Sequence, residues 1–95
     1  MSDVTVQHRP DNQRFEAMLD GEVAGYISYE MGDGAIDLQH TIVDDKFGGR
    51  GVGGALAKGT IDQIRDQGGL RVIPTCPFLA KWFDKNPEYS DLRAN

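Results

Sequence analysis

A run of glycines from Gly48 to Gly54 points most directly to ligand binding, because five of these seven positions are glycine. Glycine lets the backbone approach a ligand closely and turn several N–H groups toward one point. A helix that begins here adds unpaired N–H groups and the positive end of its dipole, which favour a phosphate. Lys46 and Arg50 add positive charge at the rim of the loop. A flexible surface turn is the alternative interpretation.

Two side chains, His40 and Cys76, are candidates for catalysis. The unperturbed pKa of a histidine, about 6.5, suits a general base. Cys76 directly precedes Pro77 at an expected helix start, and a helix N-terminus favours the thiolate form of a cysteine. Each residue also has a structural interpretation. His40 shares its strand phase with Ile36, Leu38 and Ile42, as a half-buried strand histidine would, and Cys76 is small enough to be a packing residue.

The first half of the chain alternates between apolar and polar residues, which predicts about four antiparallel strands. Asp20-Gly21 and Gly32–Gly34 mark the tight turns between them. After Gly51 the period becomes helical, and the helix is expected to end at Gly68-Gly69. Its expected buried face consists of Val52, Leu56, Ala57, Thr60, Ile61 and Ile64.

A short strand at 70–73 and a second helix from Pro77 to the Asn86-Pro87 break complete the pattern. The apolar face of that helix is Phe78, Leu79, Trp82 and Phe83. The first helix connects two neighbouring strands as a crossover, so the last two strands are expected to be parallel. The prediction is one domain over residues 1–95 with an α/β fold of the α+β type. A mostly antiparallel, twisted sheet is combined with a central helix, a further parallel strand and a C-terminal helix.

Composition excludes several classes of function. The net charge of −5 disfavours binding to nucleic acid or to an anionic membrane surface. No apolar stretch approaches the roughly 20 residues that span a bilayer. The N-terminal residues lack the apolar run of a signal peptide, and a single cysteine allows no internal disulfide, so a cytoplasmic location is expected. We expect no metal site.

The glycine loop matches two nucleotide-binding motifs poorly. Gly49, Gly51 and Gly54 have the spacing of a dinucleotide fingerprint, but the next strand ends at Val72-Ile73-Pro74 without the carboxylate that would bind a ribose. A P-loop is excluded because no Gly-Lys-Ser/Thr follows. A small nucleotide-binding domain is therefore the least favoured class.

The chain resembles a short subgroup of the GNAT family, the acetyl-CoA-dependent N-acetyltransferases, over 4–92. The family loop reads Gln/Arg-x-x-Gly-x-Gly/Ala and lies between an antiparallel strand and a helix. Gly51-Val52-Gly53 fits that pattern, whereas Gly48 stands where the family has Gln or Arg, which removes one donor to a pyrophosphate. Three further segments carry the resemblance, namely 40–43, 72–78 and 86–89.

The resemblance implies a minimal GNAT fold that binds acetyl-CoA or CoA. The pantetheine arm would lie between diverging strands at 37–43 and 70–74, and a backbone N–H near Ile42 would polarise the thioester carbonyl. Cys76 would then lie near the thioester, and Tyr89 would either protonate the leaving thiolate or pack. The implied CoA-binding residues are Thr41, Ile42, Val43, Phe47, Gly48, Gly49, Arg50, Gly51, Val52, Gly53, Gly54 and Cys76.

Two functions remain open at this point. The first is N-acetyl transfer to an unidentified amine, with His40 and Cys76 as the catalytic candidates. The second is a CoA-binding or interaction module with little turnover. The residues before the second strand, 9–13, are too few for the helices that shape the acceptor site in larger GNATs, so an open, shallow acceptor side is expected.

Overall fold

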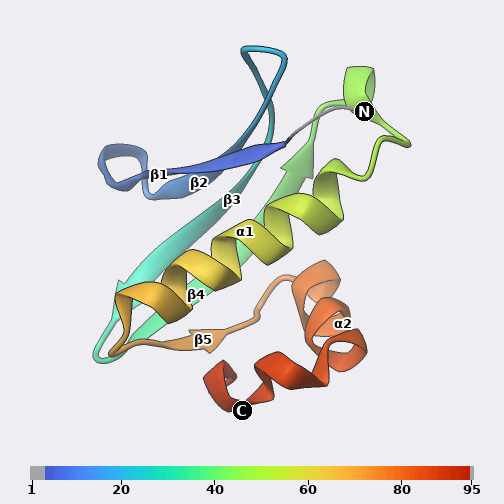
Figure 1. Cartoon of the computed structure of the whole chain (residues 1–95). Coiled ribbons are helices and arrows are strands. Elements are labelled where there is room, and N and C mark those ends of the chain that lie inside the picture. The colour runs from blue at the N-terminus through green and yellow to red at the C-terminus, as the bar shows by residue number, and fades with distance from the viewer. Residues whose placement is uncertain (1–3, 95) are drawn as a thin grey trace.

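The computed structural model describes residues 4–94, and Figure 1 shows the arrangement of its elements. The strands are β1 (Thr5–Arg9), β2 (Arg14–Leu19), β3 (Glu22–Gly32), β4 (Ala35–Val43) and β5 (Arg71–Ile73). The α-helices are α1 (Val52–Gln67) and α2 (Pro77–Lys85), and three 3-10 segments are η1 (Pro10–Asn12), η2 (Asp45–Phe47) and η3 (Pro87–Leu92). This order and these types confirm the predicted sequence of strands and helices.

The five strands form one sheet in the order β1-β2-β3-β4-β5. The first four pair antiparallel, and β5 pairs parallel to β4, as the crossover through α1 requires. The β2–β3 turn has positive φ at both central residues, Asp20 (53°) and Gly21 (78°). Asp-Gly is favoured in such a turn because both residues tolerate this backbone conformation.

The core lies between the sheet and α1, which crosses one face of the sheet (Figure 1). All six α1 residues predicted to face inward are buried. Gly59 lies where α1 crosses β1, and a Cβ there would come within 2.4 Å of Val6 Cγ2. The helix therefore needs a glycine at this position to approach the strand. No helix within residues 4–94 has the length and apolar character needed to cross a membrane.

The C-terminal segment lies along the outer edge of β5. Arg93 forms a parallel bridge with Val72, and the N–H of Ala94 donates to the Val72 carbonyl at 2.8 Å. The Arg71 guanidinium donates to the Arg93 carbonyl at 2.7 Å. The short strand β5 is thus paired on both of its sides.

Candidate functional site

A bulge in β4 determines which way the candidate site residues face. Tyr29 pairs with Leu38 and Ser28 with His40, so Gln39 is an extra residue and the alternation shifts there. Leu38 is buried on the α1 side, and beyond the bulge it is Thr41 that continues this inner row. His40 is exposed, on the opposite face. The expectation that His40 shares the phase of Ile36 and Leu38 is therefore wrong, and so is its half-buried interpretation.

The backbone of β4 beyond the bulge offers hydrogen-bonding groups away from β3. The N–H of Asp44 donates to the Ala24 carbonyl at 2.8 Å, which sets the phase of the antiparallel ladder. Hydrogen-bonded and non-hydrogen-bonded residue pairs alternate along such a ladder. The backbone groups of Ile42 and His40 therefore bond to β3. The N–H groups of Thr41 and Val43 point the other way. The N–H of Ile42 is therefore used in the sheet, and the backbone N–H groups that face away from β3 near it are those of Thr41 and Val43.

Strands β4 and β5 diverge next to these groups. Their pairing consists of Ala35–Asp37 against Arg71–Ile73 and stops there. The N–H of Cys76 then donates to the Leu38 carbonyl at 3.0 Å, and the chain turns away into α2. A gap in strand pairing therefore opens beside Thr41 and Val43, within the region where the family resemblance implies diverging strands.

The thiol of Cys76 lies at the end of this gap. It is 6% exposed, and its Sγ lies 3.4 Å from the Thr41 hydroxyl. Burial raises the pKa of the thiol, but the Thr41 hydroxyl and the backbone N–H groups of Leu79, Phe78 and Thr41 lower it. The net effect holds the pKa of Cys76 below its usual value, which favours the thiolate.

His40 and Cys76 are not brought together. The side chain of Thr41 contacts Cys76 on the inner face of β4, and the adjacent His40 projects from the outer face. The two residues therefore cannot act as a cysteine–histidine pair. Tyr89 has another position: its hydroxyl donates to Asp62 at 2.6 Å, and its ring lies 5.0 Å from that of Trp82. This position fits the packing interpretation.

The glycine loop leads into α1 without a capping side chain. Gly49 and Gly51 have φ of 77° and 75°, and Gly51 is the N-cap residue. The first backbone bond of the helix runs from the Ala55 N–H to the Gly51 carbonyl at 3.1 Å. The N–H groups of the first helical turn (52–54) therefore have no partner among the described residues. The same turn contains no acidic residue, which leaves its positive end open to an anion.

The basic residues at the rim of the loop already have carboxylate neighbours. The Lys46 ammonium lies 3.0 Å from Glu22, and the Arg50 guanidinium lies 3.7 Å from Asp20. Both cations also lie over the ring of the buried Phe47, at 5.5 and 5.7 Å. An anion on the loop would therefore compete with carboxylates of the β2–β3 turn for these cations.

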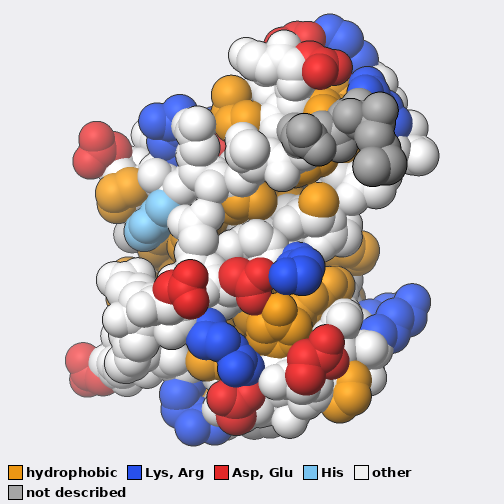
Figure 2. Space-filling view, in the orientation of Figure 1, with side chains coloured by type: hydrophobic (Ala, Val, Ile, Leu, Met, Phe, Trp, Pro, Cys, Tyr) orange, Lys and Arg blue, Asp and Glu red, His pale blue; other side chains and the backbone are white. Residues whose placement is uncertain are grey.

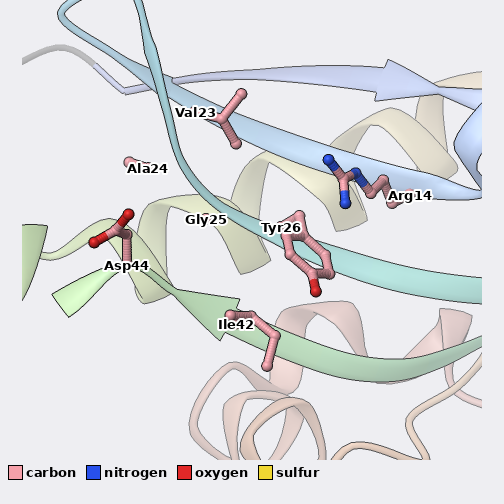
Figure 3. Close-up of a pocket in the computed structure, with 7 residues that line it drawn as sticks. All are labelled: Arg14, Val23, Ala24, Gly25, Tyr26, Ile42 and Asp44. Carbon is pink, nitrogen blue, oxygen red and sulfur yellow. The ribbon is translucent and has the colours of Figure 1, made fainter.

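The outer face of the sheet carries a shallow hollow that sequence reasoning missed. Its volume is about 210 Å³, and Figure 3 shows that its walls come from β2, β3 and β4, with α1 behind them. The Arg14 guanidinium lies 4.4 Å from the centre of the Tyr26 ring, beside the exposed Ile42. The hydrophobic pattern of these strands carries no signal of a hollow, because the alternation reports only which side chains are buried. No helix in the described part of the chain covers it.

Phe78 is the second departure from the sequence analysis. It was expected on the apolar face of α2, but it is 43% exposed, whereas Leu79 and Phe83 are buried. A Cβ at Gly53 would lie 3.2 Å from Phe78 Cζ, so the ring rests against the first turn of α1. The absence of a side chain at Gly53 thus makes room for Phe78. This is a packing role in addition to the expected one of letting a phosphate approach the backbone.

Comparison with known sequences identifies the family. Residues 14–92 match the sequence model of the GCN5-related N-acetyl-transferase family. The chain belongs to this family. Protein NATD1 of Xenopus tropicalis is 34% identical to it over 88 residues, which is 90% of this chain and 80% of the relative. Protein NATD1 of Homo sapiens is 33% identical over 86 residues, with 88% of this chain and 75% of the relative covered.

Family membership accounts for the two features that organise the site. A minimal GNAT fold combines a mostly antiparallel sheet with one parallel strand after the central helix, as here. The open first turn of α1 and the gap between β4 and β5 lie on the same side of the molecule as the start of α2. The structure therefore brings Thr41 and Cys76 into contact, sets Phe78 at the start of α2 against Gly53 of the first α1 turn, and leaves His40 on the outer face.

Proposed function

We propose that this protein is an acetyl-CoA-dependent N-acetyltransferase. The observation that carries the proposal is the combination of an uncapped helix start with a gap in strand pairing whose β4 edge turns backbone groups away from β3. The N–H groups of the first α1 turn suit a pyrophosphate. The Thr41 and Val43 edge suits the amide groups of a pantetheine arm, which would extend toward Cys76.

Positioning and polarisation are the main contributions of this chain to the reaction. Acetyl-CoA supplies the acetyl group: the amine nitrogen bonds to the carbonyl carbon, the C–S bond breaks, and the thiolate leaves. The Thr41 N–H points into the gap, where it can donate to the thioester oxygen. His40 lies on the outer face, from which an amine would approach, and takes the amine proton in this proposal. Direct attack leaves Cys76 a positioning residue beside the thioester.

A second candidate function is a CoA-binding module with little turnover. It is favoured by the position of His40, which is exposed on the outer face and to whose ring the described residues provide no orienting hydrogen bond. The presence of Gly48 in place of Gln or Arg also removes one donor to a pyrophosphate. Calorimetry with CoA, acetyl-CoA, ATP and NAD separates CoA binding from nucleotide binding. Release of free thiol from acetyl-CoA in the presence of amines then separates an enzyme from a binding module.

A matched pair of glycine variants tests the loop. Gly51 and Gly68, at opposite ends of α1, both have φ of 75° and no atom within 4 Å of an added Cβ. Alanine should strain Gly51, whose ψ of 15° lies in the left-handed region, by about 1–2 kcal/mol, and it should strain Gly68, whose ψ is 162°, by more. Gly51→Ala should also weaken CoA binding about tenfold, because the Cβ and any backbone shift disturb the N–H groups that face the phosphates. Gly68→Ala should leave the dissociation constant unchanged. Equal affinities for the two variants would contradict the proposal.

A further inference from the structure

A second hollow lies between the first turn of α1 and the exposed side of α2. Its volume is about 260 Å³, and it is lined by Gly54, Phe78, Lys81, Trp82 and Lys85. The four α2 residues follow one another at helical spacing and therefore share one face of the helix. Figure 2 shows hydrophobic side chains gathered over α2 beside α1, with basic and acidic side chains at their border. The hollow shares Gly54 with the open helix start described above.

The charges of this hollow are unusual for the molecule. The chain has 15 acidic and 10 basic residues, and its other basic side chains bond to carboxylates, carbonyls or rings. For Lys81 and Lys85 the described residues provide no such partner. They are four positions apart on one helix, an arrangement of like charges that destabilises an isolated helix. The nearby Asp84 pairs instead with Arg93 at 3.0 Å.

The aromatic residues of the hollow are open to a flat ligand. Phe78 is 43% exposed and rests against Gly53, so its free side faces the hollow. Trp82 is half-buried, and its ring meets Phe83 edge-on at 5.7 Å. Exposed aromatic faces stack on nucleobases without a need for specific hydrogen bonds. Two free ammonium groups beside such rings suit a ligand that joins a base to a phosphate.

We infer that this hollow binds the adenosine 3′-phosphate end of CoA, so that the protein selects CoA over shorter phosphopantetheine donors. The inference rests on the proposed function, because the pyrophosphate must lie on the first turn of α1 for the adenosine to reach α2. The base stacks on Phe78 and Trp82, and the 3′-phosphate pairs with Lys81 and Lys85. A solvated lysine face is the competing interpretation, and it predicts no dependence on the ligand's 3′-phosphate.

Calorimetry at low salt with CoA and two truncated ligands, dephospho-CoA and 4′-phosphopantetheine, tests the inference. The wild type should bind CoA about fivefold more tightly than dephospho-CoA, since exposed ion pairs contribute modestly. The double variant Lys81→Gln/Lys85→Gln should bind the two equally. Lys58→Gln, which removes an exposed lysine paired with Asp62 on α1, should keep the wild-type ratio. Phe78→Leu should weaken both adenosine ligands about tenfold and leave 4′-phosphopantetheine unaffected.

Fluorescence of the single tryptophan provides an independent measurement. Emission from Trp82 should change with CoA and dephospho-CoA but not with 4′-phosphopantetheine. Equal binding of CoA and dephospho-CoA by the wild type overturns the inference and leaves the proposed function standing. A preference for CoA that survives the double lysine variant overturns it as well. Failure of all three ligands to bind overturns the proposed function, and this inference with it.

Discussion

The contact between Cys76 and Thr41 is the most specific chemical feature at the scale of single residues. The thiol is buried at the end of a strand gap, where burial alone would make it inert. The hydroxyl of Thr41 and three backbone N–H groups offset that effect and lower the pKa of the thiol. The same groups that favour a thiolate would favour the developing negative charge of a thioester oxygen beside it.

Thr41→Val should raise the pKa of Cys76, because the variant keeps the shape of the side chain and removes the hydroxyl. The rate of alkylation of Cys76 by iodoacetamide, followed against pH by mass spectrometry, should then have its midpoint at a higher pH. The midpoint reports the pKa regardless of how accessible the buried thiol is. Thr75→Val is the control, since the hydroxyl of Thr75 donates to Asp37 and not to the thiol. A midpoint that moves equally in both variants would contradict this account.

At the scale of elements, the packing of α1 on β1 depends on one glycine. Gly59→Ala places a Cβ 2.4 Å from Cγ2 and 2.9 Å from Cβ of Val6. Overpacking typically costs about 1–3 kcal/mol, which exceeds the gain of about 1 kcal/mol in helix propensity. Denaturant unfolding should therefore show a loss of about 1 kcal/mol, and Val6→Ala should relieve part of it.

Gly54→Ala is the matched comparison for that variant. Gly54 also lies in α1, but nothing lies within 4 Å of an added Cβ. Only the gain in helix propensity applies, so the free energy of unfolding should rise by up to about 1 kcal/mol. Opposite signs for the two glycines are the expected result, and a stabilised Gly59→Ala would show that β1 moves aside easily.

The elements themselves could be predicted from the sequence because each has a local signal. The alternation of β2, the helical period of α1 and the glycine that ends it all belong to one segment of chain. The bulge at Gln39 has no such signal. The residues around it, 39–41, are all polar, so the change of phase leaves no mark in the hydrophobic pattern. For that reason the hydrophobic pattern assigns the His40 side chain to the wrong face of the sheet.

The candidate site was predictable to a similar extent. The glycine loop and Cys76 stand out as candidates because their residue types and neighbours suit the chemistry. The contact between Thr41 and Cys76 joins residues 35 positions apart, and it depends on how far β4 and β5 diverge. The exposure of Phe78 depends on the absence of a side chain at Gly53, on another helix. Such features follow from tertiary packing, which periodicity within one segment does not report.

At the scale of the whole molecule, one face of the sheet is open. Ile42 is 49% exposed there, next to the β4 edge, whereas Met31, 53% exposed at the far end of β3, lies opposite the buried Ile36 and so belongs to the other face. If an amine approaches across this face, a positive charge near its path should repel it. Ile42→Arg should lower kcat/KM for acetyl transfer to a lysine-containing peptide about tenfold, with the dissociation constant for CoA unchanged. Met31→Arg should affect neither quantity, and equal losses in both variants would argue against an acceptor path near Ile42.

The stability of the whole molecule in acid should depend on Glu16. Burial raises the pKa of this carboxyl, but Arg14 and Arg9 at 2.7 and 3.2 Å lower it below the usual value. Its stabilising effect is therefore complete above the unfolded-state pKa of about 4.3 and is lost as the pH falls through the lower folded-state pKa.

Glu16→Gln should reduce the free energy of unfolding by roughly 1–2 kcal/mol at pH 7, because both arginines are partly exposed and screened. The deficit should shrink as the pH falls below the unfolded-state pKa and should approach zero once the folded wild type has lost the same charge. Glu22→Gln, at an exposed pair with Lys46, should change stability by less than about 0.5 kcal/mol. A deficit that is independent of pH would assign the effect of Glu16 to packing.

The backbone of 93–94 along β5 also limits how copies of this protein can assemble. A sheet grows into a fibre only when each added strand leaves a fresh edge for the next. Here the β5 side is occupied by the chain itself, through Arg93 and Ala94. Among the described strands, β1 is left as the terminal edge where a second copy could add, because the unpaired stretch of β4 at 41–43 is an internal gap beside β5. Pairing of β1 with β1 uses up both available edges, so sheet extension ends at two chains and does not propagate.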